Sequence, residues 1–88
     1  MFNNRRSDID IIIEILKIAQ EGVNKTKILY QGNLSHTQLQ HYLMLLLDKD
    51  IISEEINKEG NANSKIYKTT EKGSNLLFDI NKTLSYFR

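Results

Sequence analysis

The sequence contains no cysteine, no proline and only four glycines among its 88 residues. Without cysteine, neither a disulfide framework nor a zinc site built on thiolates can form. The glycines are scattered, so there is no glycine-rich loop that could hold a phosphate group. The longest apolar run covers residues 42–47, far short of the ~20 residues that span a bilayer. No apolar stretch follows the two N-terminal arginines as it would in a signal peptide. These absences favour a cytosolic protein.

Length and charge set further bounds. We expect residues 1–88 to form one domain with one core. Twelve lysines and arginines against eleven acidic residues give a net charge of +1, and 40% of the residues are hydrophobic. That balance fits a folded soluble domain. A strongly basic total would be the usual mark of a nucleic-acid-binding protein, so here the distribution of charge matters more than its sum.

Hydrophobic periodicity predicts a first helix over residues 7–21. Ser7 is suited to cap it, with Asp10 three residues later, and Gly22 is a natural stop. The predicted apolar stripe consists of Ile9, Ile12, Ile13 and Leu16, which Ile15 and Ala19 can extend.

Two further helices follow closely. Asn24 can cap a short helix with Ile28 and Leu29 inward, ended by residues 32–33. Ser35 and Gln38 then form the S-x-x-Q capping box of a longer helix that ends near residues 49–50. Its predicted buried stripe consists of Leu39, Leu43, Leu46 and Leu47, with Tyr42 beside them.

The period changes after residue 50. Residues 51–56 and 65–69 are typical of two short strands, and the Gly, Asn and Ser residues between Lys58 and Ser64 predict a turn. Thr69 or Thr70 can cap a last helix from residue 71 to about residue 86. The predicted fold is therefore mostly α-helical with a small β-hairpin, in the order helix, helix, helix, hairpin, helix.

Two helices joined by a tight turn, the second with an exposed polar face, match the helix-turn-helix plan. In that plan the second helix lies in the major groove of DNA. Here the second helix turns His36, Thr37, Gln40 and His41 away from its leucines. Such side chains can hydrogen-bond to bases, and glutamine can pair with adenine through two hydrogen bonds.

Positive and polar groups occur where a DNA backbone would pass. Arg5 and Arg6 precede the first helix. The carboxylates gather elsewhere, on the first helix and at the base of the hairpin. The full set of candidate DNA contacts is Lys25, Thr26, Lys27, Ser35, His36, Thr37, Gln38, Gln40, His41, Lys58, Asn61, Asn63 and Lys65.

The segments NKTKILYQGNLSHTQLQHYLMLLLDKDIIS and YKTTEKGSNLL resemble those of archaeal winged helix-turn-helix DNA-binding proteins. The resemblance implies that the N-terminal half of the third helix reads bases and that the hairpin, the wing, touches the backbone or minor groove. In relatives a glycine usually stands where this chain has Asp50. Several small members of the family pair through the last helix.

The last helix carries an apolar seam that is longer than a small core needs, and a bare seam would be an exposed apolar patch. We expect residues 70–88 to form a dimerisation helix, together with the first helix. The predicted contacts are Leu76, Ile80, Leu84 and Phe87.

The favoured function is a sequence-specific, double-stranded DNA-binding transcription regulator that acts as a homodimer in the cytoplasm, at the nucleoid. His36 and His41 are five residues apart without a third ligand, so neither a metal nor another cofactor is expected. No nucleophile or pair of carboxylates indicates an enzyme. Two alternatives stay open: a winged-helix module that docks proteins, which the low net charge suits, and an architectural chromatin protein, which it disfavours.

Overall fold

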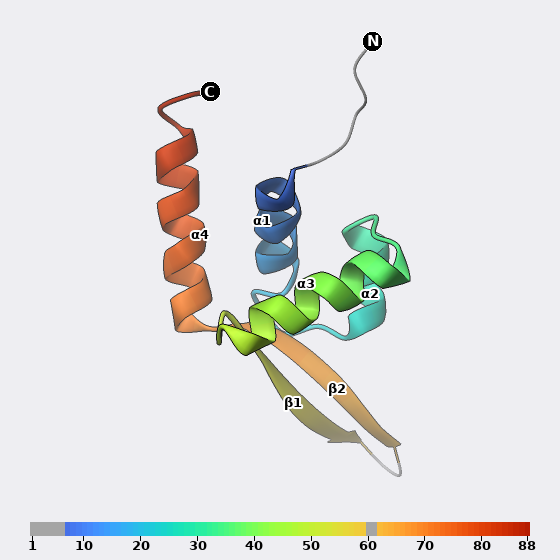
Figure 1. Ribbon diagram of the computed structural model, residues 1–88. Coiled ribbons are helices and arrows are strands. Elements are labelled where there is room, and N and C mark those ends of the chain that lie inside the picture. Colours follow the sequence, from blue (N-terminus) through green and yellow to red (C-terminus); the bar gives the residue numbers. More distant parts are fainter. Residues whose placement is uncertain (1–6, 60–61) are drawn as a thin grey trace.

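The computed structural model describes residues 7–59 and 62–88. Four helices and one antiparallel hairpin follow one another in the predicted order. They are α1 (Asp8–Ile18), α2 (Lys25–Gln31), α3 (His36–Asp48), β1 (Ile52–Glu59), β2 (Ala62–Thr69) and α4 (Glu71–Leu84). In Figure 1, α1 and α4 stand side by side, α3 runs across their lower ends, and the hairpin projects away from the helices.

Side-chain caps define where the helices begin. Both predicted capping boxes are confirmed, with Ser7 and Asp10 at the start of α1 and Ser35 and Gln38 at the start of α3. Asn24 caps α2 by accepting a hydrogen bond from the backbone N–H of Lys27 at 2.8 Å. Because these caps satisfy backbone N–H groups that no helical carbonyl can reach, the local sequence fixes the helix starts.

The core lies where α1, α2, α3 and β1 converge. Its most deeply buried side chains are Ile15, Leu16, Ile28, Leu39, Leu46 and Ile52. The predicted stripe on α1 was partly wrong, because Ile11 is buried whereas Ile9 is 43% exposed. The reason is that α1 packs on more than one side, so its buried arc is wider than a single stripe. Ile9 instead faces α4.

The hairpin is longer and its turn shorter than the sequence indicated. Pairing runs from Ile52 opposite Thr69 to Glu59 opposite Ala62, so residues expected in the turn are paired as strand. Asn and Ser have low strand propensity, but continuous backbone pairing outweighs that preference here. Lys58, expected in the turn, lies opposite Asn63.

Among the described residues, left-handed backbone occurs at three places between consecutive elements. Gly22 follows α1 with a φ of +89°, Asn33 follows α2 with 52°, and Asp50 follows α3 with 62°. The first two were predicted as stops. Asp50 occupies the position where the resemblance led us to expect glycine, which is the residue best suited to a positive φ. Aspartate is among the few other residues that adopt this conformation.

None of the helices in the described part of the chain has both the length and the apolarity needed to cross a membrane.

Candidate nucleic-acid interface

Helix α3 has one buried and one exposed face along its first half. Leu39 and Leu43 are 1% and 3% exposed, because they pack against the core. The predicted polar residues of the same half lie on the opposite side and are exposed; they are His36, Thr37, Gln40 and His41. Met44, one turn further, is 60% exposed. The polar face is therefore available for contact with another molecule.

A shallow concavity of about 550 Å³ lies over this face. It is lined by Lys25, His36, Thr37, Leu39, Gln40 and His41. Lys25 comes from the first turn of α2, which the turn at residues 32–34 brings beside the start of α3. The structure thus gathers residues that the sequence reasoning had assigned to one interface into one depression. Thr26 and Lys27 are exposed on the same first turn of α2.

Two of the predicted contacts are partly engaged in capping α3. The Ser35 hydroxyl accepts the backbone N–H of Gln38 at 3.1 Å, and the Gln38 carbonyl Oε1 accepts the backbone N–H of Ser35 at 3.0 Å. The cap uses Gln38 through its oxygen, which leaves the two amide hydrogens on Nε2 as the donors for an outside partner.

The hairpin presents Lys58 and Lys65 on one face, since alternate and directly opposed residues share a face of a sheet. Lys65 Nζ lies 3.8 Å from Glu54 Oε2, a partner that the sequence reasoning missed. Asn63 lies opposite Lys58 in the strand register. Asn61, like Arg5 and Arg6, falls outside the described residues.

Helix α3 is tied to α1 by a contact between residues far apart in the sequence. The hydroxyl of Tyr42 donates a hydrogen bond to the Asp8 carboxylate. The rings of Tyr42 and the adjacent His41 make a T-shaped contact, with centroids 5.0 Å apart. The buried Tyr42 therefore provides a contact that restrains the exposed His41 ring. No local sequence signal could have revealed it, because 34 residues separate Tyr42 from Asp8.

A second tyrosine anchors the hairpin. Burial of its ring, and then the hydrogen bond to Glu54, raise the pKa of Tyr67 to about 12. Its hydroxyl donates to Glu54 Oε2 at 2.8 Å. Glu54 on β1 thus contacts both Tyr67 and Lys65 on β2 and ties the two strands together, while the buried Tyr67 ring packs in the core.

A family model described as winged helix-turn-helix matches residues 5–86 of this sequence. The chain belongs to the winged helix-turn-helix family. In the terms of that family, α3 is the recognition helix and the β1–β2 hairpin is the wing. No curated protein matches the sequence closely enough to serve as a relative.

Solved structures share the winged-helix architecture. Sso10a-2, a DNA-binding protein from Sulfolobus solfataricus, is 26% identical with a TM-score of 0.75, and the alignment covers 92% of this chain and 81% of that one. A PadR-like transcription factor from Bacteroides fragilis is 22% identical, with a TM-score of 0.71 and coverage of 88% and 81%. A ZitR variant from Lactococcus lactis is 19% identical, with a TM-score of 0.69 and coverage of 99% and 64%. The last two comparisons show a common fold.

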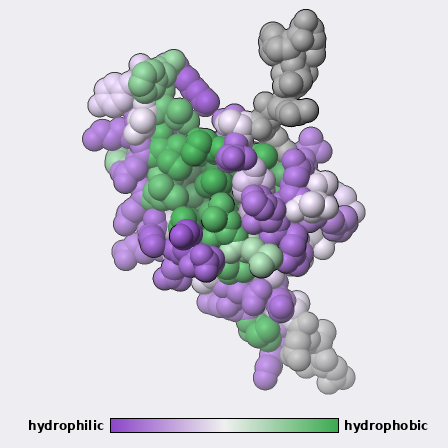
Figure 2. All heavy atoms as spheres, in the orientation of Figure 1, coloured by the Kyte–Doolittle hydropathy of each residue, from purple (hydrophilic) through white to green (hydrophobic). Residues whose placement is uncertain are grey.

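The four predicted dimer contacts have different surroundings. Leu76 packs partly against this molecule's own core. Ile80 and Leu84 are half-buried and line a groove of about 270 Å³ together with Ile9 on α1. Phe87 is 80% exposed. Figure 2 shows the apolar side chains as a green band over the face between α4 and α1.

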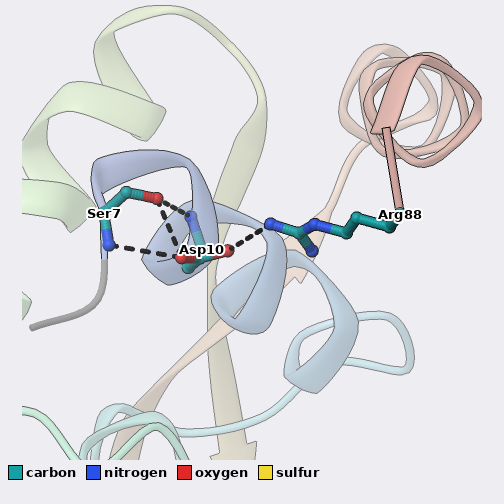
Figure 3. Close-up of polar contacts among 3 residues, drawn as sticks. All are labelled: Ser7, Asp10 and Arg88. Carbon is teal, nitrogen blue, oxygen red and sulfur yellow. Dashed lines mark hydrogen bonds and ion pairs between the residues drawn. The ribbon is translucent and has the colours of Figure 1, made fainter. Parts of the chain in front are cut away.

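The far end of α4 is held to the start of α1. Arg88 Nη2 lies 3.4 Å from Asp10 Oδ1, while the other oxygen of that carboxylate accepts hydrogen bonds from Ser7 (Figure 3). Hydrogen bonds from the Ser7 side chain, then from the Ser7 backbone, and then Arg88 lower the pKa of Asp10 below its ordinary value. The sequence reasoning assigned no role to Arg88, although it lies next to the predicted contact Phe87.

Within residues 7–59 and 62–88, no three histidine, cysteine, aspartate or glutamate side chains are grouped so that they could hold a metal ion.

Proposed function

We propose that this winged-helix protein is a sequence-specific, double-stranded DNA-binding transcription regulator that acts as a homodimer. The observation that carries the proposal is the concavity beside Lys25, which is lined mainly by polar side chains from the first half of the recognition helix. In helix-turn-helix proteins this half of the helix meets base edges in the major groove. The 26% identical Sulfolobus protein, described as DNA-binding, supports the same function.

The exposed face of the recognition helix would contact the bases. His36, Thr37 and Gln40 carry the donors and acceptors that distinguish base pairs in the major groove. No carboxylate interrupts this face before Asp48, so nothing on it repels a phosphate.

The lysines around this face would contact the DNA backbone. Lys25 and Lys27 stand at the start of α2, and Lys65 stands on the wing. Such contacts place the protein on DNA without selecting sequence.

Dimerisation would cover the apolar face of α4. Ile9 and Phe87 are 43% and 80% exposed. Ile9 lines one groove with the half-buried Ile80 and Leu84, and Phe87 follows the end of α4. A contiguous apolar patch of this kind marks an interaction site, and two-fold pairing is the commonest way that identical chains bury one. Two recognition helices would then enter successive major grooves about 34 Å apart.

The DNA-binding proposal is tested by gel-shift titration of the full chain against genomic fragments and random duplexes at two salt concentrations. We expect a small set of fragments to bind far more tightly than random DNA, and binding to weaken with salt. Equal affinity for every duplex would favour the architectural alternative. No binding to any duplex at low salt would contradict both DNA-binding functions and favour a protein-docking module.

The dimer is tested separately by sedimentation. Phe87→Glu should convert the dimer to monomer without loss of the fold, because the Phe87 side chain is highly exposed. Tyr30→Glu is the matched control, since Tyr30 is 74% exposed on α2 and lies away from the α1–α4 face. A wild-type chain that sediments as a monomer at all concentrations would contradict the homodimer.

A further inference from the structure

The recognition helix and α4 meet at a junction built from several hydrogen bonds. The Thr70 hydroxyl lies 2.8 Å from the carbonyl oxygen of Asp50 and 3.0 Å from that of Ile51, so its single hydrogen is shared between the two. The backbone N–H of Thr70 also donates to the Ile51 carbonyl, at 3.0 Å. From the first turn of α4, Lys72 Nζ donates to the carbonyl oxygen of Lys49 at 2.9 Å. The first turn of α4 therefore binds the carbonyls that follow the last turn of α3.

Gly73 brings the backbones at this junction into close contact. A Cβ at this position would lie 2.2 Å from the carbonyl oxygen of Ile51 and 2.9 Å from Thr69 Cγ2. Any larger residue must push α4 away from the segment that follows α3. Gly73 is also the one buried residue of α4, all of which lies in the described part of the chain.

Beyond this junction α4 packs on one side only, against α1 and the adjoining core. Leu76 and Leu77 are partly buried against the core, and the exposed pair Arg88–Asp10 restrains the far end. An exposed ion pair contributes little to holding a helix in place. Residues 70–73 bond α4 directly to the segment that follows α3, so they set the angle between α3 and α4 together with the packing of α4 on α1.

Small changes of that angle have large effects along the helix. At 1.5 Å per residue, the fourteen residues of α4 extend about 21 Å. A tilt of about 10° at the first turn displaces the far end by about 4 Å, which exceeds the 3.4 Å rise between neighbouring base pairs on one strand of DNA. In a dimer joined through α4, such a tilt moves one recognition helix relative to the other.

We propose that Thr70, Lys72 and Gly73 are positioning residues that set the spacing of the two DNA half-sites that the dimer accepts. This inference rests on the proposed function, and it adds that specificity has a second source besides the base-reading residues. These three residues act through the angle between α3 and α4 rather than through contact with DNA.

The test begins with selection of inverted repeats from a random duplex library by the full-length wild-type chain. Binding is then measured on a single half-site, and on the selected repeat with spacers one and two base pairs shorter or longer. Each added base pair also rotates one half-site by about 35°, given 10–10.5 base pairs per turn. Wild type should show one preferred spacer.

Three variants probe the junction. Thr70→Val and Lys72→Ala should bind the single half-site as wild type does but accept neighbouring spacers severalfold better relative to the preferred one. Gly73→Ala should move the preferred spacer. Thr70→Ser keeps the hydroxyl and should restore the wild-type profile, and Lys82→Ala serves as a lysine control on the same helix.

The outcomes separate the two proposals. Folded Thr70→Val and Lys72→Ala proteins with the wild-type spacer profile would overturn the positioning role and leave the proposed function intact, whether or not Gly73→Ala folds. Lower melting temperatures with an unchanged profile would show a purely structural junction and overturn the role as well. A wild-type chain that selects no repeat would overturn both the homodimeric regulator and this inference.

Discussion

Val23 and Tyr67 are joined by two backbone hydrogen bonds: the N–H of Val23 donates to the Tyr67 carbonyl at 2.9 Å, and the N–H of Tyr67 donates to the Val23 carbonyl at 2.7 Å. This pair forms an isolated antiparallel bridge at the edge of the wing. It bonds the segment just before α2 directly to β2, and so connects the helix-turn-helix unit to the wing. The Tyr67 side chain is buried in the core and strengthens that connection.

The Tyr67 phenol should make stability fall at high pH. Its pKa is raised from 10.0 in the unfolded chain to about 12 in the fold, so the fold favours the neutral form. The resulting stabilisation is complete below about pH 10 and is lost as the pH rises through 12. Thermal unfolding measured across this range should show the loss in wild type and a smaller loss in Tyr67→Phe. Tyr30→Phe, at an exposed position, should behave as wild type; an identical alkaline profile for all three proteins would contradict the assignment.

Asp10 should make stability fall at low pH. Its pKa is lowered from 3.8 mainly by the hydrogen bonds from Ser7 and further by Arg88. The stabilisation is therefore complete above pH 3.8 and is lost as the pH falls through the lower value in the fold. The stability difference between wild type and Asp10→Asn should shrink over that interval in acid unfolding experiments. Asp79→Asn is an exposed control on α4. A difference that stays constant with pH would show that the charge of Asp10 contributes nothing.

The left-handed backbone at Asp50 should be relieved by glycine. Left-handed backbone raises the conformational energy of an L-residue by roughly 1–2 kcal/mol, and for aspartate the increase is smaller than for most residues. Asp50→Gly should therefore raise the free energy of unfolding by about 0.5–1 kcal/mol. Asp48→Gly, two residues earlier in helical backbone, should lower it by about 0.3 kcal/mol. Urea unfolding of the two variants measures the contrast. Destabilisation by both would indicate that the Asp50 side chain, rather than its backbone, matters.

Two residues of the proposed interface, Gln40 and Lys27, should affect DNA binding in different ways. Gln40→Ala should reduce discrimination against the wrong base by about 1–3 kcal/mol at one position, while affinity for random DNA changes little. Lys27→Ala should weaken binding to all sequences and reduce the slope of affinity against salt by about one. Competition titrations with selected and random duplexes give both quantities. Equal losses on both duplexes for Gln40→Ala would refute the base-reading role.

The sequence predicted the element order, three of the four caps and most of the core, because these depend on interactions within a few residues. Ser35 and Gln38 are three positions apart, and a capping box requires nothing else. The polar face of α3 could be predicted for the same reason, since helical periodicity alone places Gln40 and Leu39 on different sides. The winged helix-turn-helix family was likewise recognisable from contiguous segments.

Only the tertiary structure decided which apolar residues are covered and how the elements are oriented. The periodicity of α1 could not place Ile9 outside the core, because its exposure depends on where α4 lies. Lys72 carries no signal in the sequence, yet its ammonium group binds the end of α3, 23 residues away. Contacts of this kind arise when chain segments distant in sequence converge, so local patterns that specify each helix leave the angles between helices undetermined.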